Sequence, residues 1–480
     1  MLRVKTDVKE HAYESEIAQA PVVGKNVGLT IDSDMQHVAE QALERAVIDN
    51  HAEHGSLVAM DPKTGEVLAL ANYPTYDLNE HLHAGETPRG RENLAVVAPF
   101  EPGSVFKVVT LSAALETTNL QPSSMINCGG GSITLFGRVI HDSHPYGSLT
   151  FEDVLAKSSN IGAIHIGMQV GSKNMYDYIR RFGFGRRTGI ELPAEAPGML
   201  RPLRRWQATT MGSIPMGHEI SVTSLQLAQL GSVIANGGFL VHPHVVAWKQ
   251  APGEKKQAVQ NPPPARVLRP ETVITMRMMM HRVTMPGGTA QRLHVIGYSI
   301  AGKTGTAQIF DFAHHAYTHK YNASFLGFAP TMNPSVVIVV TISGTTGEAG
   351  FGGRAAGPAF EKAMATGLRS LGVMRDVPEE IEQLAQKEKT DAPVKESDDI
   401  ALAELNPPTE QEMREAAGEA EPDTPKVPNF AGKTVQDVMQ EAAAIGLDVE
   451  LRGDGLARTQ NPPPGSALVN GERVQVRFAR

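Results

Sequence analysis

The chain has 480 residues, enough for two or three domains, and 41% of them are hydrophobic, as in an ordinary globular protein. Its net charge of −8 gives no basis for nucleic-acid binding. Cys128 is the only cysteine, which excludes an internal disulfide. The sequence contains no apolar run near the ~20 residues that a membrane-spanning helix needs. Residues 1–26 resemble neither a signal peptide nor an anchor.

The first predicted elements are a helix and a hairpin. Apolar residues recur at helical spacing over 34–50, and Ser33 followed by Gln36 predicts a capping box at the start of that helix. The segment 57–71 contains two apolar runs separated by Lys63-Thr64-Gly65. We interpret this Lys-Thr-Gly as the turn of a hairpin of two strands.

Ser104-Val105-Phe106-Lys107 is the first of three motifs with the residues of a catalytic site. Glu101-Pro102-Gly103 predicts a turn, and the apolar residues that follow predict a buried helix with Ser104 at its N-terminus. Ser104 and Lys107 then share one helix face, one turn apart. A neutral Lys107 amine can take the proton of Ser104, which requires a pKa lowered by burial or by a second cation such as Lys303.

The other two motifs are Ser158-Ser159-Asn160 and Lys303-Thr304-Gly305-Thr306. The three together supply a nucleophile, a proton-handling lysine, a polar relay and an anion-binding strand, the requirements for acyl transfer to a serine. Each is short enough to occur by chance, and Ser172-Lys173-Asn174 repeats the second pattern. The third motif opens a run towards 323–328, which we interpret as a second strand. Their combination therefore carries the inference.

An alternative interpretation rests on the same region. The segment from Gly297 to Thr304 fits the phosphate-binding loop pattern of a P-loop NTPase, with 292–296 as a possible preceding strand. Such a loop must open a helix directly after its lysine, but Gly305 interrupts, and the apolar run 336–342 ends without an acidic residue for magnesium. We therefore rank the nucleotide-binding reading below acyl transfer.

The sequence between 158 and 370 predicts helices that alternate with the strands described above. The segment 158–232 is mostly helical, and a closing helix covers 357–370. With the predicted strands, these elements form an α/β sandwich.

The last hundred residues change in character. Residues 376–426 carry 16 acidic and 5 basic side chains and few large apolar ones, so 373–425 is predicted to be an acidic flexible linker. Beyond it, 434–444 keeps a helical stripe that Gly446 ends, and 474–478 alternates as a final strand. A small α+β domain is predicted at 426–480.

Other polar clusters are not assigned a role. His314, His315 and His319 lack the nearby carboxylates or cysteines of a metal site. His141 and His144 fall in a Pro- and Gly-containing segment that we interpret as a solvated loop. The sequence therefore predicts no metal and no cofactor.

The three motifs and their surroundings resemble a known family, the class B penicillin-binding proteins. The resemblance also rests on four flanking segments: Leu29 to Asp32, Val58 to Ala69, Glu101 to Ser104 and Val222 to Ala228. It covers 27–372 as a transpeptidase domain, with 1–26 as the remnant of an N-terminal pedestal or linker. Residues 426–480 resemble a PASTA domain. The family's fold has a five-stranded antiparallel sheet flanked by helices, with a helical subdomain bearing Ser104 and Ser158.

The resemblance implies a role for each matching residue in peptidoglycan cross-linking. Ser104 is acylated by the penultimate D-Ala of a stem peptide, with Lys107 as general base, and an amine of a neighbouring stem peptide then takes the acyl group. β-Lactams acylate the same serine. The implied supporting residues are Ser158 as proton relay, Asn160 as a holder of Lys107 and substrate, Lys303 as electrostatic support, Thr304, Gly305 and Thr306 as the strand that binds the substrate carboxylate, and the backbone N–H groups of Ser104 and Thr306 as the oxyanion hole.

The same three motifs leave rival enzymes open. With water as acceptor the chain is a D,D-carboxypeptidase, and a β-lactamase-like serine hydrolase needs a deacylating glutamate. Glu191 and Glu195 lack the setting that the β-lactamase family shows. A non-catalytic envelope-binding protein ranks lower.

The resemblance further implies a location and partners. Members of the family work in the cell envelope, at the outer face of the cytoplasmic membrane, with a glycan polymerase and divisome or elongation proteins. The family normally has an N-terminal membrane anchor, and we expect none in the chain as given.

Overall fold

The computed structural model divides the chain into two units, Met1–Pro407 and Pro408–Arg480. It describes the following residues: 2–9, 11–17, 23–77, 79, 91–135, 138–311, 316–347, 350–378, 427–444, 449–466 and 474–479. His314, His315 and most of the predicted linker 373–425 lie outside these ranges. Within them, no helix combines the length and the apolar character that crossing a membrane requires.

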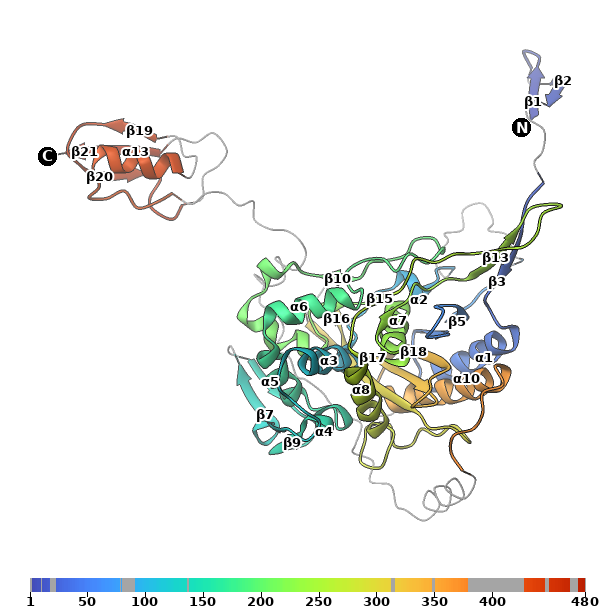
Figure 1. Cartoon of the computed structure of the whole chain (residues 1–480). Coiled ribbons are helices and arrows are strands. Elements are labelled where there is room, and N and C mark those ends of the chain that lie inside the picture. Colours follow the sequence, from blue (N-terminus) through green and yellow to red (C-terminus); the bar gives the residue numbers. More distant parts are fainter. Residues whose placement is uncertain are drawn as a thin grey trace. The chain divides into compact units, whose positions relative to one another are not determined.

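A five-stranded antiparallel sheet forms the centre of the first unit (Figure 1). Its order is β16-β17-β18-β4-β5, which places the Lys303 strand at one edge. The strands are β4 (His54–Met60), β5 (Val67–Tyr73), β16 (Ala301–Asp311), β17 (Ala316–Ala329) and β18 (Val336–Thr345). Every residue of β18 is buried, because helices cover both faces of the sheet.

One face of the sheet carries α1 (Ser33–Asp49) and α10 (Gly357–Ser370). The ring of Phe325 on β17 meets that of Phe360 on α10 at a centroid distance of 4.7 Å. Leu43 and Val47 of α1 lie against β4 at Gly55, where a Cβ atom would have no room. These close contacts exclude water and give the first unit one continuous core.

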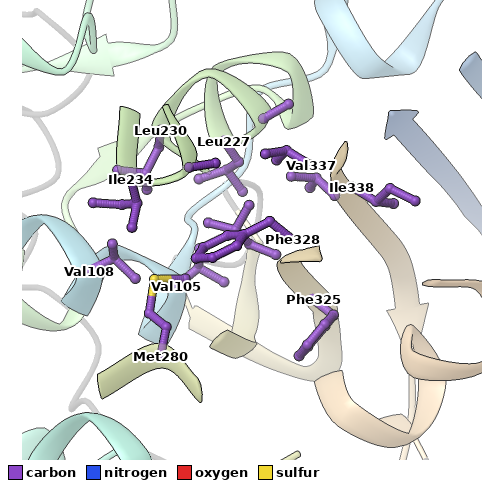
Figure 2. Packing of buried hydrophobic residues seen from close by; sticks show 14 of the residues in the cluster. Val105, Val108, Leu227, Leu230, Ile234, Met280, Phe325, Phe328, Val337 and Ile338 are labelled. Carbon is purple, nitrogen blue, oxygen red and sulfur yellow. The ribbon is translucent and has the colours of Figure 1, made fainter. Parts of the chain in front are cut away.

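The opposite face carries α7 (Ser224–Ala235) and α8 (Pro270–Arg282). Figure 2 shows Leu230 and Ile234 of α7 and Met280 of α8 packed with Phe328 of β17 and Val108. Val108 belongs to α3 (Lys107–Thr117), so the helix that follows the first motif is anchored in the core by its apolar side chains. Burying an aliphatic side chain contributes about 1.5–3 kcal/mol, which fixes the position of this helix.

A helical region beside the sheet completes the first unit. Its main helices are α4 (Phe151–Ala156), α5 (Asn160–Val170) and α6 (Ser172–Arg181). Two short helices are α2 (Leu94–Val97) and α9 (Gly352–Ala355). The small strands are β1 (Leu2–Thr6), β2 (Ala12–Ile17), β3 (Asn26–Leu29), β6 (Met125–Asn127), β7 (Ser132–Leu135), β8 (Arg138–His141), β9 (Ser148–Thr150), β10 (Met199–Leu200), β11 (Ile220–Ser221), β12 (Phe239–Leu240), β13 (Val246–Gln250), β14 (Gln257–Ala258) and β15 (Ala265–Arg266).

The second unit has its own small core. Helix α13 (Val435–Ala444) accompanies a three-stranded sheet of order β19-β21-β20. The strands are β19 (Val449–Arg452), β20 (Leu456–Asn461) and β21 (Val474–Ala479). Buried and exposed residues alternate along β21, as the sequence predicts, but β20 was not predicted.

The predicted capping box of the first helix is wrong. The N-cap of α1 is Asp32, whose carboxylate accepts a hydrogen bond from the Met35 backbone N–H at 2.8 Å, so Ser33 and Gln36 do not form a capping box. The Gln36 amide instead bonds both backbone groups of Leu70 on β5. The phosphate-binding loop is also excluded, because Lys303 and Thr304 lie in a strand where that motif requires a helix.

Candidate active site

The Ser104 motif forms a tight turn that leads into α3. Gly103–Phe106 is a 3₁₀ turn (η1), and the α-helix begins only at Lys107, three residues later than the sequence predicts. Gly103 has a φ of 52° and donates its N–H to the carbonyl of Gly217 at 3.1 Å. A Cβ atom at Gly103 would sit 3.1 Å from the Cβ of Ala307 on β16. The glycine therefore lets the nucleophile turn approach the third motif closely.

Glu101 braces the same turn from its N-terminal side. Its carboxylate pairs with Nδ1 of His218 at 2.9 Å and accepts the backbone N–H of Glu219 at 2.9 Å. Glu219 in turn forms an ion pair with Arg201. The hydroxyl of Tyr317, on β17, lies 3.5 Å from the Glu101 carboxylate. Two separate segments, 218–219 and β17, thus contact Glu101 and hold the residues that precede Ser104.

The Ser158 motif is the junction between two helices. Thr150 caps α4, and Ser158 follows that helix with a φ of 60°, a left-handed conformation that is strained for a residue with a side chain. Ser159 is the N-cap of α5 and accepts the N–H of Gly162 at 2.9 Å. Asn160 is then the first helical residue. The Ser-x-Asn spacing reflects one residue for the turn, one for the cap and one for the helix.

The three motifs meet at the hydroxyl of Ser158. The ammonium nitrogen of Lys107 lies 3.2 Å from Ser158 Oγ, and that of Lys303 lies 2.9 Å from the same oxygen. Lys107 also donates to the Ser158 carbonyl at 2.5 Å and to Oδ1 of Asn160 at 2.8 Å. Both lysine side chains and Ser158 are buried. Ser104, one turn before Lys107, is also buried, at 7% exposure.

Burial sets the protonation of Lys107. Removal from water lowers the pKa of its amine from 10.5 to about 7, and the negative charge of Asp142 acts in the opposite direction. A general base is most effective with a pKa near the working pH. The cause of the lowered pKa is therefore burial, the first of the two causes that the sequence left open.

The third motif supplies a strand edge with two hydroxyls. Thr304 Oγ1 lies 2.8 Å from the hydroxyl of Thr289, a residue that the sequence interpretation missed, and 3.3 Å from the Lys303 amine. Thr306 Oγ1 accepts the backbone N–H of Gly352 at 3.1 Å. A Cβ atom on Gly305 would lie 2.4 Å from Ser324 Oγ and 2.8 Å from Val105. Only glycine permits this packing of β16 against η1.

The second Lys-Thr-Gly sequence does not belong to the Ser104 site. Lys63-Thr64-Gly65 forms the turn between β4 and β5, where Asp61 accepts the backbone N–H groups of Lys63 and Thr64. Histidine, cysteine and acidic side chains form no metal-binding group of three or more within the described ranges. His319 is exposed there.

Two family models match this chain. Residues 55–365 match the penicillin binding protein transpeptidase domain, and 425–480 match the PASTA domain.

Relatives match over the larger unit. Penicillin-binding protein PbpB of Mycolicibacterium smegmatis is 36% identical over 351 residues, 71% of this chain and 54% of PbpB. The probable peptidoglycan D,D-transpeptidase PenA of Neisseria meningitidis is 34% identical over 362 residues, 75% of this chain and 60% of PenA. The chain thus spans a little over half the length of these two relatives.

A solved structure of a penicillin binding protein has a fold similar to that of this chain. Penicillin binding protein 3 from Mycobacterium tuberculosis, complexed with aztreonam, is similar with a TM-score of 0.69 and 32% identity. The match covers 78% of this chain and 88% of that one.

Proposed function

Because the chain belongs to the penicillin-binding protein transpeptidase family, we propose that it is a peptidoglycan D,D-transpeptidase that works through an acyl ester on Ser104. The observation that carries the proposal is the convergence of two buried lysine amines on Ser158 Oγ, with the pKa of Lys107 lowered to about 7. That arrangement holds a base at one helical turn from the nucleophile and a proton relay beside it.

The proposed reaction has two halves. In the first, Ser104 Oγ attacks the carbonyl carbon of the penultimate D-Ala and Lys107 takes the hydroxyl proton. Lys107 then gives a proton to Ser158, which delivers its own hydroxyl proton to the nitrogen of the departing D-Ala as the amide C–N bond breaks. The backbone N–H groups of Ser104 and Thr306 stabilise the oxyanion. In the second, the amine of a neighbouring stem peptide attacks the ester, releases Ser104 and forms the cross-link. Asn160 holds the Lys107 amine throughout.

The substrate strand is proposed to be β16. Thr304 and Thr306 bind the terminal carboxylate, and Lys303 supports the relay electrostatically. β-Lactams, whose amide resembles the D-Ala-D-Ala bond, are proposed inhibitors at Ser104. A relative of the same fold is known in complex with aztreonam.

The location and domain limits follow from the same proposal. The substrate places the site in the cell envelope, outside the cytoplasmic membrane, where a glycan polymerase and division or elongation proteins are proposed partners. The transpeptidase domain is proposed to cover 27–372 and the PASTA domain 426–480.

The first test is acylation. Purified protein is incubated with a fluorescent penicillin beside a Ser104→Ala variant, with intact-mass detection. One stable adduct on the native chain and none on the folded variant supports the acyl-serine mechanism. The absence of an adduct on the folded native chain refutes it, and rapid turnover of the label indicates a hydrolase.

A second test separates the acceptors. A stem pentapeptide ending in D-Ala-D-Ala is supplied with and without an amine acceptor. Formation of the cross-linked product supports the transpeptidase, whereas release of D-Ala with water as the only acceptor used identifies a D,D-carboxypeptidase.

A further inference from the structure

The start of α5 is held by a carboxylate from a distant loop. Asp142 Oδ1 accepts the backbone N–H groups of Asn160 at 2.5 Å and Ile161 at 3.1 Å. Its other oxygen accepts the hydroxyl of Ser159 at 2.6 Å. α5 has 11 residues, and an anion at its N-terminus binds N–H groups that have no partner within the helix. Asp142 therefore contacts each of the last two residues of the Ser-x-Asn motif.

These contacts determine where the amide of Asn160 points. Its backbone N–H is bound by Asp142, and its Nδ2 donates to the carbonyl of His141 at 3.1 Å. With both of these donors occupied by one segment, Oδ1 faces the amine of Lys107 at 2.8 Å. The segment that the sequence analysis left as a solvated loop without a role thus holds a residue that contacts the proposed base.

We propose that Asp142 is a positioning residue of the acylation step, which orients Asn160 towards Lys107 and supplies the negative charge that balances this buried amine. The inference rests on the proposed function of Ser104 and Lys107. Asp142 acts on Lys107 indirectly, by holding Asn160 and by the electrostatic effect of its negative charge.

The effect of the Asp142 charge on the pKa of Lys107 has a sign that can be tested. This charge raises the pKa of Lys107 against the larger effect of burial. The other titratable groups at this site are Cys128, whose sulfur lies 3.5 Å from Ser159 Oγ, and Lys303, which shares Ser158 Oγ with Lys107. Asp142→Asn keeps the shape and one acceptor oxygen but removes the charge. The pKa of Lys107 in this variant then falls below its native value.

The experiment measures acylation by the fluorescent penicillin between pH 5 and pH 9. Because Lys107 acts as a base only when neutral, the rate rises as the pH passes its pKa. In Asp142→Asn the midpoint of this rise moves down by about 1 pH unit. The plateau rate constant falls about 10-fold, since Asn160 is held less firmly and the base is weaker.

Asp32→Asn is the matched control. Asp32 also caps a helix with its carboxylate, but it does so at α1 and additionally accepts the hydroxyl of Ser370. This variant loses a comparable helix cap and keeps the native midpoint. An Asp142→Asn enzyme with a lower rate and an unmoved midpoint has lost only structural support, and that result overturns the proposal.

A second readout does not depend on activity. The ¹³Cε chemical shift of Lys107 is followed against pH in the native protein and in Asp142→Asn, with a Lys107→Arg variant to assign the signal. A lower titration midpoint in Asp142→Asn supports the inference even without acylation, and an unchanged midpoint refutes it. Failure of the native chain to acylate refutes the proposed function instead.

Discussion

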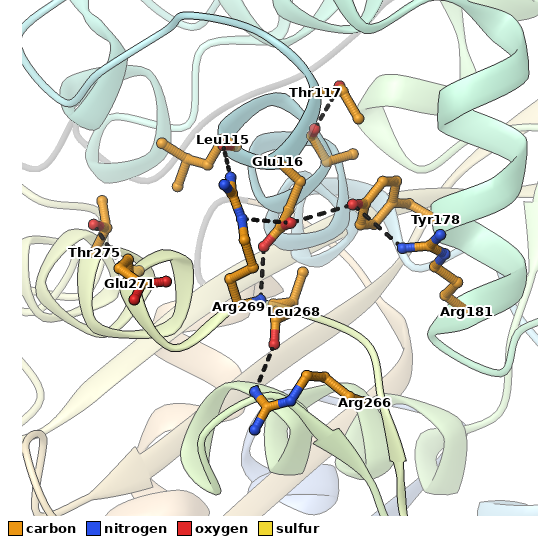
Figure 3. Close-up of polar contacts among 11 residues, drawn as sticks. Leu115, Glu116, Thr117, Tyr178, Arg181, Arg266, Leu268, Arg269, Glu271 and Thr275 are labelled. Carbon is orange, nitrogen blue, oxygen red and sulfur yellow. Dashed lines mark hydrogen bonds and ion pairs between the residues drawn. The ribbon is translucent and has the colours of Figure 1, made fainter.

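Lys107 at the first residue of α3 and Glu116 in its last turn are both ionisable residues whose side chains have little exposure, but their partners differ. Lys107 is surrounded by a carbonyl, a hydroxyl and an amide oxygen, and its pKa falls to about 7. Glu116 meets the guanidinium of Arg269 at 3.0 Å and accepts the Arg269 backbone N–H at 2.8 Å (Figure 3).

This difference separates a reactive cluster from a structural one. A buried amine without full charge compensation is poised to change protonation, so it stores free energy that the fold must supply. The Glu116 carboxylate, bound to the side chain and the backbone N–H of Arg269, ties α3 to the segment before α8. The same helix thus has a functional end and a tethering end.

The largest expected effect is at the functional end. Lys107→Met removes the proposed base but keeps an apolar stem of similar length. We expect the acylation rate constant to fall by about 10³-fold, within the range attributed to general bases. Stopped-flow or intact-mass kinetics with the fluorescent penicillin measure it. Acylation within threefold of the native rate would show that another group takes the Ser104 proton.

The stability of the same variant reports the stored free energy. Between pH 7 and pH 10.5 the unfolded chain holds a proton on Lys107 that the folded chain has lost, so the free energy of unfolding of the native protein rises with pH. Relative to Lys107→Met, the native protein gains about 2 kcal/mol from pH 7 to pH 9. Urea denaturation at the two pH values measures this change, and a constant difference would show that the pKa of Lys107 in the folded protein lies above 9.

A substitution at the tethering end of α3 should lower the stability of the protein and leave its acylation rate unchanged. Glu116→Gln removes the charge and weakens the contacts with Arg269, whose own side chain is 59% exposed. We expect a loss of about 1 kcal/mol in the free energy of unfolding. The acylation rate should stay native at pH 8, where Ser104→Ala serves as the inactive reference. A large fall in acylation would mean that the two ends of α3 are coupled.

The resemblance to the transpeptidase family predicted the fold of the main domain, and short-range patterns predicted individual helices and strands. The predicted transpeptidase fold and the PASTA domain are confirmed by the family matches and the similar solved structure. The predicted helix 357–370 has the bounds of α10, and the apolar run 336–342 lies within the buried strand β18. The assignment of catalytic roles to Ser104, Lys107, Ser158 and Asn160 remains a prediction.

Contacts between distant segments were the part that could not be predicted. Asp142 reaches α5 across 18 residues, and Gln36 bonds β5 across 34, without a local pattern to mark either. Asp32 competes with Ser33 as a cap, and only the geometry of the chain decides between two adjacent capping residues. Gly103, the first residue of the 3₁₀ turn before α3, packs closely on Ala307 of β16, a contact that no property of the motif itself reveals.

The smallest expected effect concerns Tyr178, the second side chain that contacts Glu116. The hydroxyl of Tyr178 donates to Glu116 at 3.4 Å and accepts from Arg181 at 3.5 Å, both long distances for hydrogen bonds (Figure 3). Tyr178→Phe keeps the buried ring and leaves Glu116 bound to Arg269. We therefore expect a change of about 0.5 kcal/mol or less in urea denaturation. A loss above that of Glu116→Gln would show that Tyr178, and not Arg269, is the main partner of the carboxylate, and would shift the tether from the segment before α8 to α6.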